Sequence, residues 1–221
     1  MSKTSLITTA IVLSGGAGLR LNGRDKGLEK FSGQALIEHV LGRICRQVQS
    51  TIICANRNIE QYQLLNSIVC QDLNNHDVDS EINKQSFQGP ISGITSALKQ
   101  QVVNSKATAV LISSCDTPNV PNDLKQRLEA GLNANLDFNV AVAHDGDRRQ
   151  NLHCLIERAA WQSLIDFYDA GGRAMHRWFT HEGVLNVDFS DCPECFSNYN
   201  TPEHLDNKVH KKGLQNRPSN N

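Results

Sequence analysis

The chain has 221 residues, enough for one large α/β domain and only just enough for two small ones. Hydrophobic residues make up 39% and charged residues 20%, the composition of a folded, water-soluble protein. The formal net charge of −1 argues against a surface that binds nucleic acid or a membrane through its overall charge, so any basic site must be local.

The amino-terminal apolar run ends at Gly15, is too short to span a bilayer and is followed by no signal-peptide cleavage pattern. The seven cysteines are odd in number and lie mostly within apolar runs, which predicts reduced, buried thiols in a cytoplasmic protein. Cys192 and Cys195 have C-x-x-C spacing, but a single pair is weak support for zinc, and we expect no zinc site there.

Hydrophobic periodicity predicts strands and helices that alternate along the chain. In chain order, the first half contains strand 11–13, helix 36–48, strand 51–55, helix 59–65, strand 68–70, a polar surface loop over 73–88, helix 89–103 and strand 107–112. The second half contains a helix from Pro121 through Leu132, strands 139–143 and 152–156, helices 159–168 and 173–180, strand 184–189 and a terminal helix from Thr201. Strands separated by helices imply parallel βαβ units, so we predict one α/β domain with a mostly parallel sheet.

A glycine-rich loop follows directly on the first strand. The apolar run 11–13 leads into the glycines of 15–18, and glycine lets successive backbone N–H groups line one anion-binding concavity. Arg20, Arg24 and Lys26 bring positive charge to the same stretch. The combination predicts a cradle for a triphosphate.

This loop fits neither of two familiar phosphate-binding patterns. Gly18 and Gly23 have the spacing of a P-loop, but Arg24-Asp25 replaces its Lys-Ser or Lys-Thr. The dinucleotide-binding pattern meets Leu21 where it requires its third glycine. The loop therefore indicates another scheme of nucleotide binding, and the alternative is a strand-to-helix turn that merely tolerates glycine.

Polar side chains follow four of the predicted strands where each strand ends. They are Ser14, Asn56, Asp72 and Asp116. Each alone is an ordinary turn or helix-capping residue. Because ligands of open α/β sheets bind outside the carboxyl ends of the strands, the four together predict one binding crevice.

Asp116 is the strongest candidate for a metal ligand. It ends an apolar strand, and a carboxylate placed there can hold Mg²⁺ beside phosphates. The alternative is that Asp116 caps the helix near Pro121, but it lies several residues too early in the chain for that.

The residues also resemble a known family. Leu13-Ser14-Gly15-Gly16, Arg20 and Asp25-Lys26-Gly27 resemble the opening motif of nucleotidyltransferases that move a nucleoside monophosphate onto a phosphate. A further set of motifs resembles the molybdenum cofactor guanylyltransferases, the MobA family: 55–57, 89–94, 115–118, 145–148, 187–191 and 198–202. The resemblance extends from about residue 8 to residue 205.

The resemblance implies a Rossmann-like, three-layer domain of the nucleotide-diphospho-sugar transferase kind over 1–205. Its nucleotide-binding half would cover about 1–120 and its pterin-binding half about 121–205, while the polar residues 206–221 predict a disordered tail. The implied reaction joins GMP from GTP to the terminal phosphate of molybdopterin and releases pyrophosphate. Its partners would be GTP and molybdopterin, with molybdenum-insertion proteins and molybdoenzyme chaperones beyond them, and we expect a monomer.

The resemblance also implies roles for individual residues. GTP would be contacted by Leu13, Ser14, Gly15, Lys26, Asn56, Asp72 and Asp116. Asp116 would bind Mg²⁺, and Lys26, Arg20 and Asp116 would be the catalytic residues. The pterin would be contacted by Arg148, Gln150, Arg173, Asn198 and Asn200. The chain departs from the family pattern at Asn22, Asn151 and Ala174.

The chemistry requires no side-chain base, because the attacking phosphate oxygen is already ionised at pH 7. Catalysis then rests on in-line positioning and on neutralising the charge of the α-phosphate and the leaving pyrophosphate. Asp72 could accept the N1–H and N2–H donors of guanine and so exclude adenine. Two alternatives remain: a cytidylyl- or sugar-phosphate nucleotidyltransferase, and a GTP-binding module that does not catalyse transfer.

Overall fold

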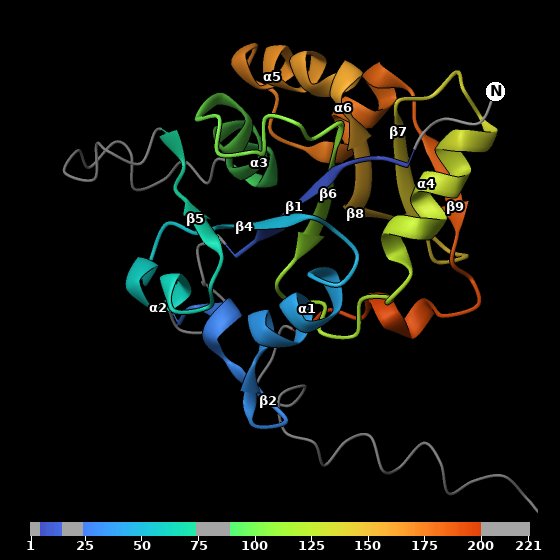
Figure 1. Cartoon of the computed structure of the whole chain (residues 1–221). Coiled ribbons are helices and arrows are strands. Elements are labelled where there is room, and N and C mark those ends of the chain that lie inside the picture. Colours follow the sequence, from blue (N-terminus) through green and yellow to red (C-terminus); the bar gives the residue numbers. More distant parts are fainter. Residues whose placement is uncertain (1–4, 15–23, 74–88, 200–221) are drawn as a thin grey trace, which may run out of the picture.

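Seven strands of the chain form one sheet, in the order β5-β4-β1-β6-β8-β7-β9, in a computed structural model that describes residues 5–14, 24–73 and 89–199 (Figure 1). The strands are β1 (Thr8–Leu13), β4 (Ser50–Cys54), β5 (Ile68–Cys70), β6 (Ala109–Ser114), β7 (Val140–His144), β8 (Arg149–Glu157) and β9 (Leu185–Asp188). β1 lies parallel to β4 and β6, β4 to β5, and β7 to β9, whereas β8 is antiparallel to both β6 and β7. The predicted mostly parallel sheet is confirmed.

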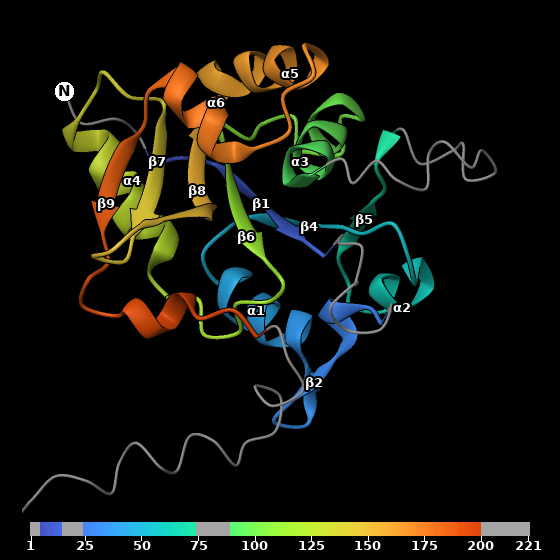
Figure 2. The same ribbon diagram turned by 180° about the vertical axis from the view of Figure 1, so that it is seen from behind.

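Helices cover both faces of this sheet. One face packs against α1 (Leu36–Ile44), α2 (Ile59–Gln63) and α4 (Leu124–Ala134), and the other against α3 (Gly89–Lys99), α5 (Trp161–Asp169) and α6 (Met175–Glu182) (Figures 1 and 2). In β1, Ala10 and Val12 belong to the core on the face covered by α1, α2 and α4, and Ile11 and Leu13 belong to the core on the opposite face. Burial on both sides explains why the strand is apolar without a polar alternation. The predicted three-layer α/β domain is confirmed.

Several short elements lie outside the predicted pattern. They are the 3-10 helices η2 (Lys26–Leu28), η5 (Arg158–Ala160) and η6 (Pro193–Phe196) and the hairpin of β2 (Lys30–Phe31) and β3 (Gln34–Ala35). The hairpin turns through Ser32 and Gly33, which both have positive φ angles (51° and 88°), as a tight two-residue turn requires. It projects away from the sheet at the bottom of Figure 1.

The remaining elements agree with the prediction in kind, and their ends differ by a few residues. The strand predicted over 152–156 begins at Arg149, and the helix predicted through residue 103 ends at Lys99. The strand predicted over 107–112 is 109–114, so Ser113 and Ser114 belong to it. The terminal helix, the tail 206–221 and most of the loop 73–88 lie outside the described residues.

All seven cysteines are free thiols, but the prediction that they are buried is wrong for Cys45. This residue follows the last turn of α1 and is exposed, whereas Cys192 and Cys195 are half-buried. Within the described ranges, no helix is both long and apolar enough to cross a membrane.

Candidate active site

The carboxyl end of β6 carries an ion pair between Asp116 and Lys26. The Lys26 ammonium lies 2.5 Å from Asp116 Oδ2, while the Ser114 hydroxyl donates to Oδ1 across 2.6 Å. The Thr117 hydroxyl donates to the same Oδ1 across 3.3 Å. Only 15% of the Asp116 side chain and 25% of the Lys26 side chain are exposed, so the pair is partly shielded from water.

The environment of Asp116 keeps its carboxyl group ionised. Burial by itself would raise the pKa of Asp116, but the charge of Lys26 and the hydrogen bonds from Lys26 and Ser114 outweigh it, and the pKa lies below its ordinary value. The sequence singled out Lys26 and Asp116 separately, and the structure brings them together. Ser114 was not singled out, because as a serine at the end of an apolar run it has the appearance of a turn residue.

The carboxylate oxygens of Asp116 fit a divalent metal cation. Among the residues that the structure describes, no group of three or more His, Cys, Asp or Glu side chains could hold a metal on its own. A cation on Asp116 would therefore complete its shell with phosphate oxygens and water. Mg²⁺ is commonly bound in this way, through one or two carboxylates together with substrate phosphates.

The first strand ends at the same edge of the sheet. The Ser14 amide donates to the Cys54 carbonyl across 2.8 Å, and the Leu13 carbonyl accepts from the Cys115 amide across 3.0 Å. These bonds fix the end of β1 between the ends of β4 and β6. Leu13 and Ser14 therefore lie at the edge that carries Asp116, as predicted, and the Ser14 hydroxyl lies 2.6 Å from that of Tyr62.

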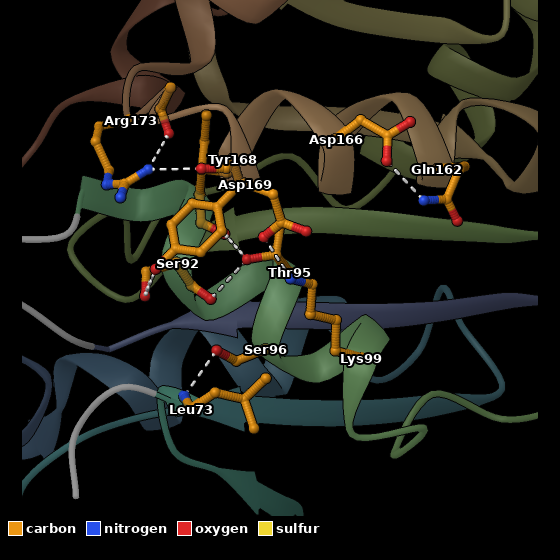
Figure 3. Close-up of polar contacts among 12 residues, drawn as sticks. Leu73, Ser92, Thr95, Ser96, Lys99, Gln162, Asp166, Tyr168, Asp169 and Arg173 are labelled. Atoms are coloured by element: carbon orange, nitrogen blue, oxygen red, sulfur yellow. Dashed lines mark hydrogen bonds and ion pairs between the residues drawn. The ribbon is translucent and has the colours of Figure 1, made fainter.

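The ends of β4 and β5 bring Asn56 and Asp72 together. The Asn56 side-chain oxygen accepts a hydrogen bond from the Asp72 amide across 2.9 Å. The next amide, of Leu73, donates to the Ser96 hydroxyl of α3 across 3.0 Å (Figure 3). Asn56 and Ser96 therefore hold the backbone at Asp72, and its carboxylate lies beside Gly93 of α3.

Gly93 allows α3 to approach these strand ends. A Cβ atom at this position would lie 3.1 Å from Leu13 Cδ2, 3.2 Å from Cys54 Cβ and 3.6 Å from Asp72 Oδ1. The first two distances are shorter than most Cβ contacts, so a larger residue would displace the helix or the strand ends. The absence of a side chain at Gly93 brings α3 against the predicted nucleotide-binding edge.

Arg173, a predicted pterin contact, lies beside the first turn of α3. Its guanidinium donates to the carbonyls of Tyr168 and Gly172, each across 2.8 Å, and lies 4.3 Å from the centre of the Tyr168 ring (Figure 3). It lines a cavity of about 410 Å³ together with Pro90, Asn151 and residues 174–176. Asn151, which departs from the family pattern, lies in this cavity's wall.

The other predicted pterin contacts lie in two separate places. Asn198 is close to the ion pair, because its side-chain oxygen accepts from the Thr117 hydroxyl across 3.3 Å and the next amide, of Tyr199, donates to the Asp116 carbonyl across 2.9 Å. Gln150 lies instead at the β7–β8 turn, where it donates to Asp145 across 2.5 Å.

The turn between β7 and β8 is organised by Asp145. This carboxylate accepts from the amides of Asp147 and Arg148 across 2.9 and 2.8 Å, which accounts for the 145–148 motif as a turn. Arg148, at the end of this turn, is exposed to solvent. The structure brings Arg148 and Gln150 together, but it does not join them to Asn198.

The motif 187–191 holds the chain as it returns towards the site. Arg127 of α4 makes two hydrogen bonds to the Asp191 carboxylate, of 3.0 and 2.8 Å, and a third to the Asp188 carbonyl. Its guanidinium also lies 3.9 Å from the centre of the buried Phe189 ring. Because η6 and Asn198 follow directly, this clamp fixes the segment that reaches Asp116.

His153 on β8 is buried near the ion pair, and sequence patterns gave no reason to single it out. It is 3% exposed, its Nε2 atom has no hydrogen-bond partner among the described residues, and its ring packs edge-on against Phe196. Burial lowers the pKa of His153 to about 4, although the charge of Asp116 acts in the opposite direction. The ring is therefore neutral at pH 7.

The predicted site residues Gly15, Arg20 and Asn200 lie outside the described residues, as does Asn22, where the chain departs from the family pattern.

Solved structures of nucleotidyltransferases share this fold. Molybdopterin-guanine dinucleotide biosynthesis protein A from Archaeoglobus fulgidus superposes with a TM-score of 0.66 at 21% identity, over 89% of this chain and 94% of that chain. A 4-diphosphocytidyl-2C-methyl-D-erythritolsynthase from Anaerococcus prevotii superposes with a TM-score of 0.63 at 12% identity, over 90% and 93%. At these identities the likeness shows the fold alone.

Sequence similarity identifies the family. The MobA-like NTP transferase domain matches residues 10–184. Molybdenum cofactor guanylyltransferase from Shewanella sp. (strain MR-4) is 36% identical over 199 residues, 90% of this chain and 93% of the relative. The same enzyme from Photobacterium profundum is 34% identical over 90% of this chain and 93% of the relative. The chain therefore belongs to the MobA-like nucleotidyltransferase family, as the sequence motifs predicted.

Proposed function

We propose that this enzyme transfers GMP from GTP to the terminal phosphate of molybdopterin, forming the guanine dinucleotide cofactor and releasing pyrophosphate. The names of its relatives and its match over most of the chain support this reaction. The structural observation that carries the proposal is the ion pair of Lys26 and Asp116, with 2.5 Å between Nζ and Oδ2, beside the end of β1. A cation and a carboxylate at that edge are the groups that a triphosphate and its metal require.

In this proposal the terminal phosphate of the pterin attacks the α-phosphorus of GTP. A new P–O bond forms, the bond between the α-phosphorus and its bridging oxygen breaks, and pyrophosphate leaves with the electron pair. The attacking oxygen carries no proton at pH 7, so none of the described side chains has to remove one. Lys26 stabilises the charge that develops on the leaving group. Arg20 is proposed to add a second positive charge.

Asp116 would hold Mg²⁺, since its carboxylate is ionised and the remaining ligands can come from phosphate and water. The bound cation would neutralise phosphate charge. Asp72 is proposed to read guanine through its N1–H and N2–H donors, with Asn56 holding the Asp72 amide. Loop residue Gly15 and strand-end residues Leu13 and Ser14 are proposed to contact the triphosphate, mainly through the backbone.

The pterin is proposed to bind in the half of the chain after residue 120. Asn198 beside Asp116 and Arg173 in the cavity at the start of α3 would contact it, with Arg148, Gln150 and Asn200 as further contacts. We further expect a monomeric, cytoplasmic enzyme that hands its product to molybdoenzyme chaperones and receives its pterin from molybdenum-insertion proteins.

Nucleotide selectivity tests the substrate assignment. Thermal unfolding is measured with Mg²⁺ and each of GTP, CTP, ATP and UTP, because only a nucleotide that binds the folded state raises the melting temperature. We expect GTP to give the largest increase, and pyrophosphate release to require both GTP and molybdopterin. A larger increase with CTP would favour a cytidylyltransferase, and GTP binding without pyrophosphate release would favour a non-catalytic module.

A further inference from the structure

The hydroxyl group of Tyr62, on α2, bridges the two segments of the chain that lie before and after the glycine-rich loop. Its ring is fully buried in the core beneath α1 and α2. Its hydroxyl lies 2.6 Å from the Ser14 hydroxyl on one side and 2.7 Å from Asp25 Oδ1 on the other. A single hydroxyl group therefore connects the end of β1 to the residue that precedes Lys26.

Asp25 is held by donors from two directions. Tyr62 donates to Oδ1, and the Asn58 side chain, just before α2, donates to Oδ2 across 3.0 Å. The Gly27 amide donates to Oδ1 across 3.2 Å and so closes the first turn of η2. Asp25 and Gly27 are thus both fixed, and Lys26 lies between them.

Gly27 fits against the same pair of hydroxyl groups. A Cβ atom on this residue would lie 2.1 Å from Ser14 Oγ and 2.5 Å from Tyr62 Oη, distances that no real Cβ occupies. On both sides of Lys26 the chain therefore contacts the Tyr62 hydroxyl group: Asp25 through a hydrogen bond and Gly27 by close packing. From that backbone the Lys26 side chain reaches Asp116.

The direction of the hydrogen bonds follows from the chemistry of the groups. An ionised carboxylate only accepts, so the Tyr62 proton is donated to Asp25, and the Tyr62 oxygen accepts from the Ser14 hydroxyl. Burial, together with the bond to Asp25, raises the pKa of Tyr62 well above its ordinary value, so the phenol keeps this proton. The Ser14 hydroxyl proton is consequently committed to Tyr62 and is not available to a phosphate.

We propose that Tyr62 and Asp25 are positioning residues for nucleotidyl transfer: through the chain Ser14–Tyr62–Asp25 they hold the Lys26 backbone so that its ammonium faces the metal-binding carboxylate. In this proposal both residues act through Lys26, and neither has to touch the substrate. The inference rests on the proposed function, because it assigns to Lys26 the role of stabilising charge on the transferred phosphates.

A double-mutant cycle of Tyr62→Phe and Lys26→Ala tests this inference. Tyr62→Phe keeps the buried ring and removes only the hydroxyl. We expect it to lower kcat/KM for GTP about tenfold in the wild-type background, in line with the loss of a hydrogen bond to a charged group. In the Lys26→Ala background we expect less than about a twofold effect, since a residue that acts through Lys26 has nothing left to position.

Thr9→Val is the matched control. It removes a hydroxyl–hydroxyl bond of 2.8 Å, between Thr9 and Ser50, at the opposite end of β1. We expect it to leave kcat/KM within about twofold, although it too removes a hydrogen bond within the sheet. The inference is overturned if Tyr62→Phe lowers kcat/KM equally in both backgrounds, or if the folded variant matches wild type.

Failure of the proposed function would be recognised separately. If wild-type protein releases no pyrophosphate from GTP with molybdopterin, the proposed transfer reaction is wrong. The double-mutant cycle is then measured with the dissociation constant of Mg²⁺–GTP in place of kcat/KM. Coupling between Tyr62 and Lys26 in nucleotide affinity would still support the positioning role. Additive effects on affinity would overturn it.

Discussion

Lys26 and Asp116 are 90 residues apart in the sequence, yet Nζ and Oδ2 of the pair are 2.5 Å apart in the fold. The contact exists because β1 lies parallel to and beside β6, so the chain that follows β1 meets the chain that follows β6 at one edge. Each charge offsets the free-energy cost of burying the other, because an isolated charge at this place would lose hydration without compensation. The pair sets a positive and a negative group where we propose that phosphates and their cation bind.

Asp116→Asn should abolish most transfer activity. The amide keeps the size of the carboxylate but removes its charge, and we expect turnover to fall by about two to three orders of magnitude, as for other groups that stabilise transition-state charge. Pyrophosphate release is the measurement. Asp137→Asn, at an exposed carboxylate in the turn between α4 and β7, is the control and should retain activity. Equal losses in the two variants would show that Asp116 has no special role.

The apolar runs identified the strands of this fold, and the strand-end rule brought forward the polar residues that follow them. The rule succeeds because parallel neighbours end at one edge whatever their separation in sequence. It placed Asn56 and Asp72 at adjacent strand ends, and the structure joins them by a hydrogen bond. It could not pair Lys26 with Asp116, because it says nothing about the path of the intervening loop.

Tyr62 shows where sequence reasoning stops. Its ring is buried in the core, but the partners of its hydroxyl, Ser14 and Asp25, directly follow β1 and directly precede η2, far from Tyr62 in the sequence. The β2–β3 hairpin was missed because two-residue strands carry no measurable periodicity. The Ser32-Gly33 dipeptide, a typical turn signal, was the one indication of it.

Gly93→Ala should weaken nucleotide binding. The added methyl group would press on Leu13 and Cys54 at 3.1 and 3.2 Å, so the start of α3 must shift beside Asp72. We expect KM for GTP to rise about fivefold to tenfold and stability to fall by about 1 kcal/mol, a typical overpacking cost. Gly42→Ala is the control: it lies in α1 with no atom within 4 Å of the new Cβ, and should stabilise the protein. An unchanged KM in Gly93→Ala would contradict the packing argument.

His153 should make the protein less stable in mild acid. Its pKa is about 4 in the folded state and about 6.5 when unfolded, so the unfolded chain alone binds a proton as the pH falls between these values. The free energy of unfolding should therefore drop by about 2 kcal/mol between pH 7 and pH 5 from this residue alone. The lowered pKa of Asp116 acts in a different range, because its stabilisation is lost only in stronger acid.

Urea unfolding of His153→Leu at pH 7 and pH 5 measures this contribution. The variant should lose that part of the pH dependence, whereas His181→Gln, at an exposed position on α6, should keep it. If the wild type and His153→Leu show the same change between the two pH values, His153 is already protonated or solvated in the folded state.

Arg127→Lys should loosen the segment that leads to Asn198. Lysine keeps the charge but cannot make two parallel bonds to Asp191 or stack its head group on Phe189 in the same way. We expect a fall in stability of about 1 kcal/mol, seen as a lower melting temperature, and a higher KM for molybdopterin than for wild type. Arg46→Lys, at an exposed position after α1, is the matched control. Indistinguishable melting temperatures would mean that the clamp does not hold this segment.

The most direct test of the account follows the α-phosphate of GTP. The protein is incubated with Mg²⁺, molybdopterin and GTP labelled at either the α- or the γ-phosphate, and the pterin product is isolated and its mass measured. The account predicts that the α-label and the mass of GMP are found on the pterin, and that the γ-label is found in pyrophosphate. A pterin that gains the γ-label, or that gains no mass while GTP is consumed, would contradict it.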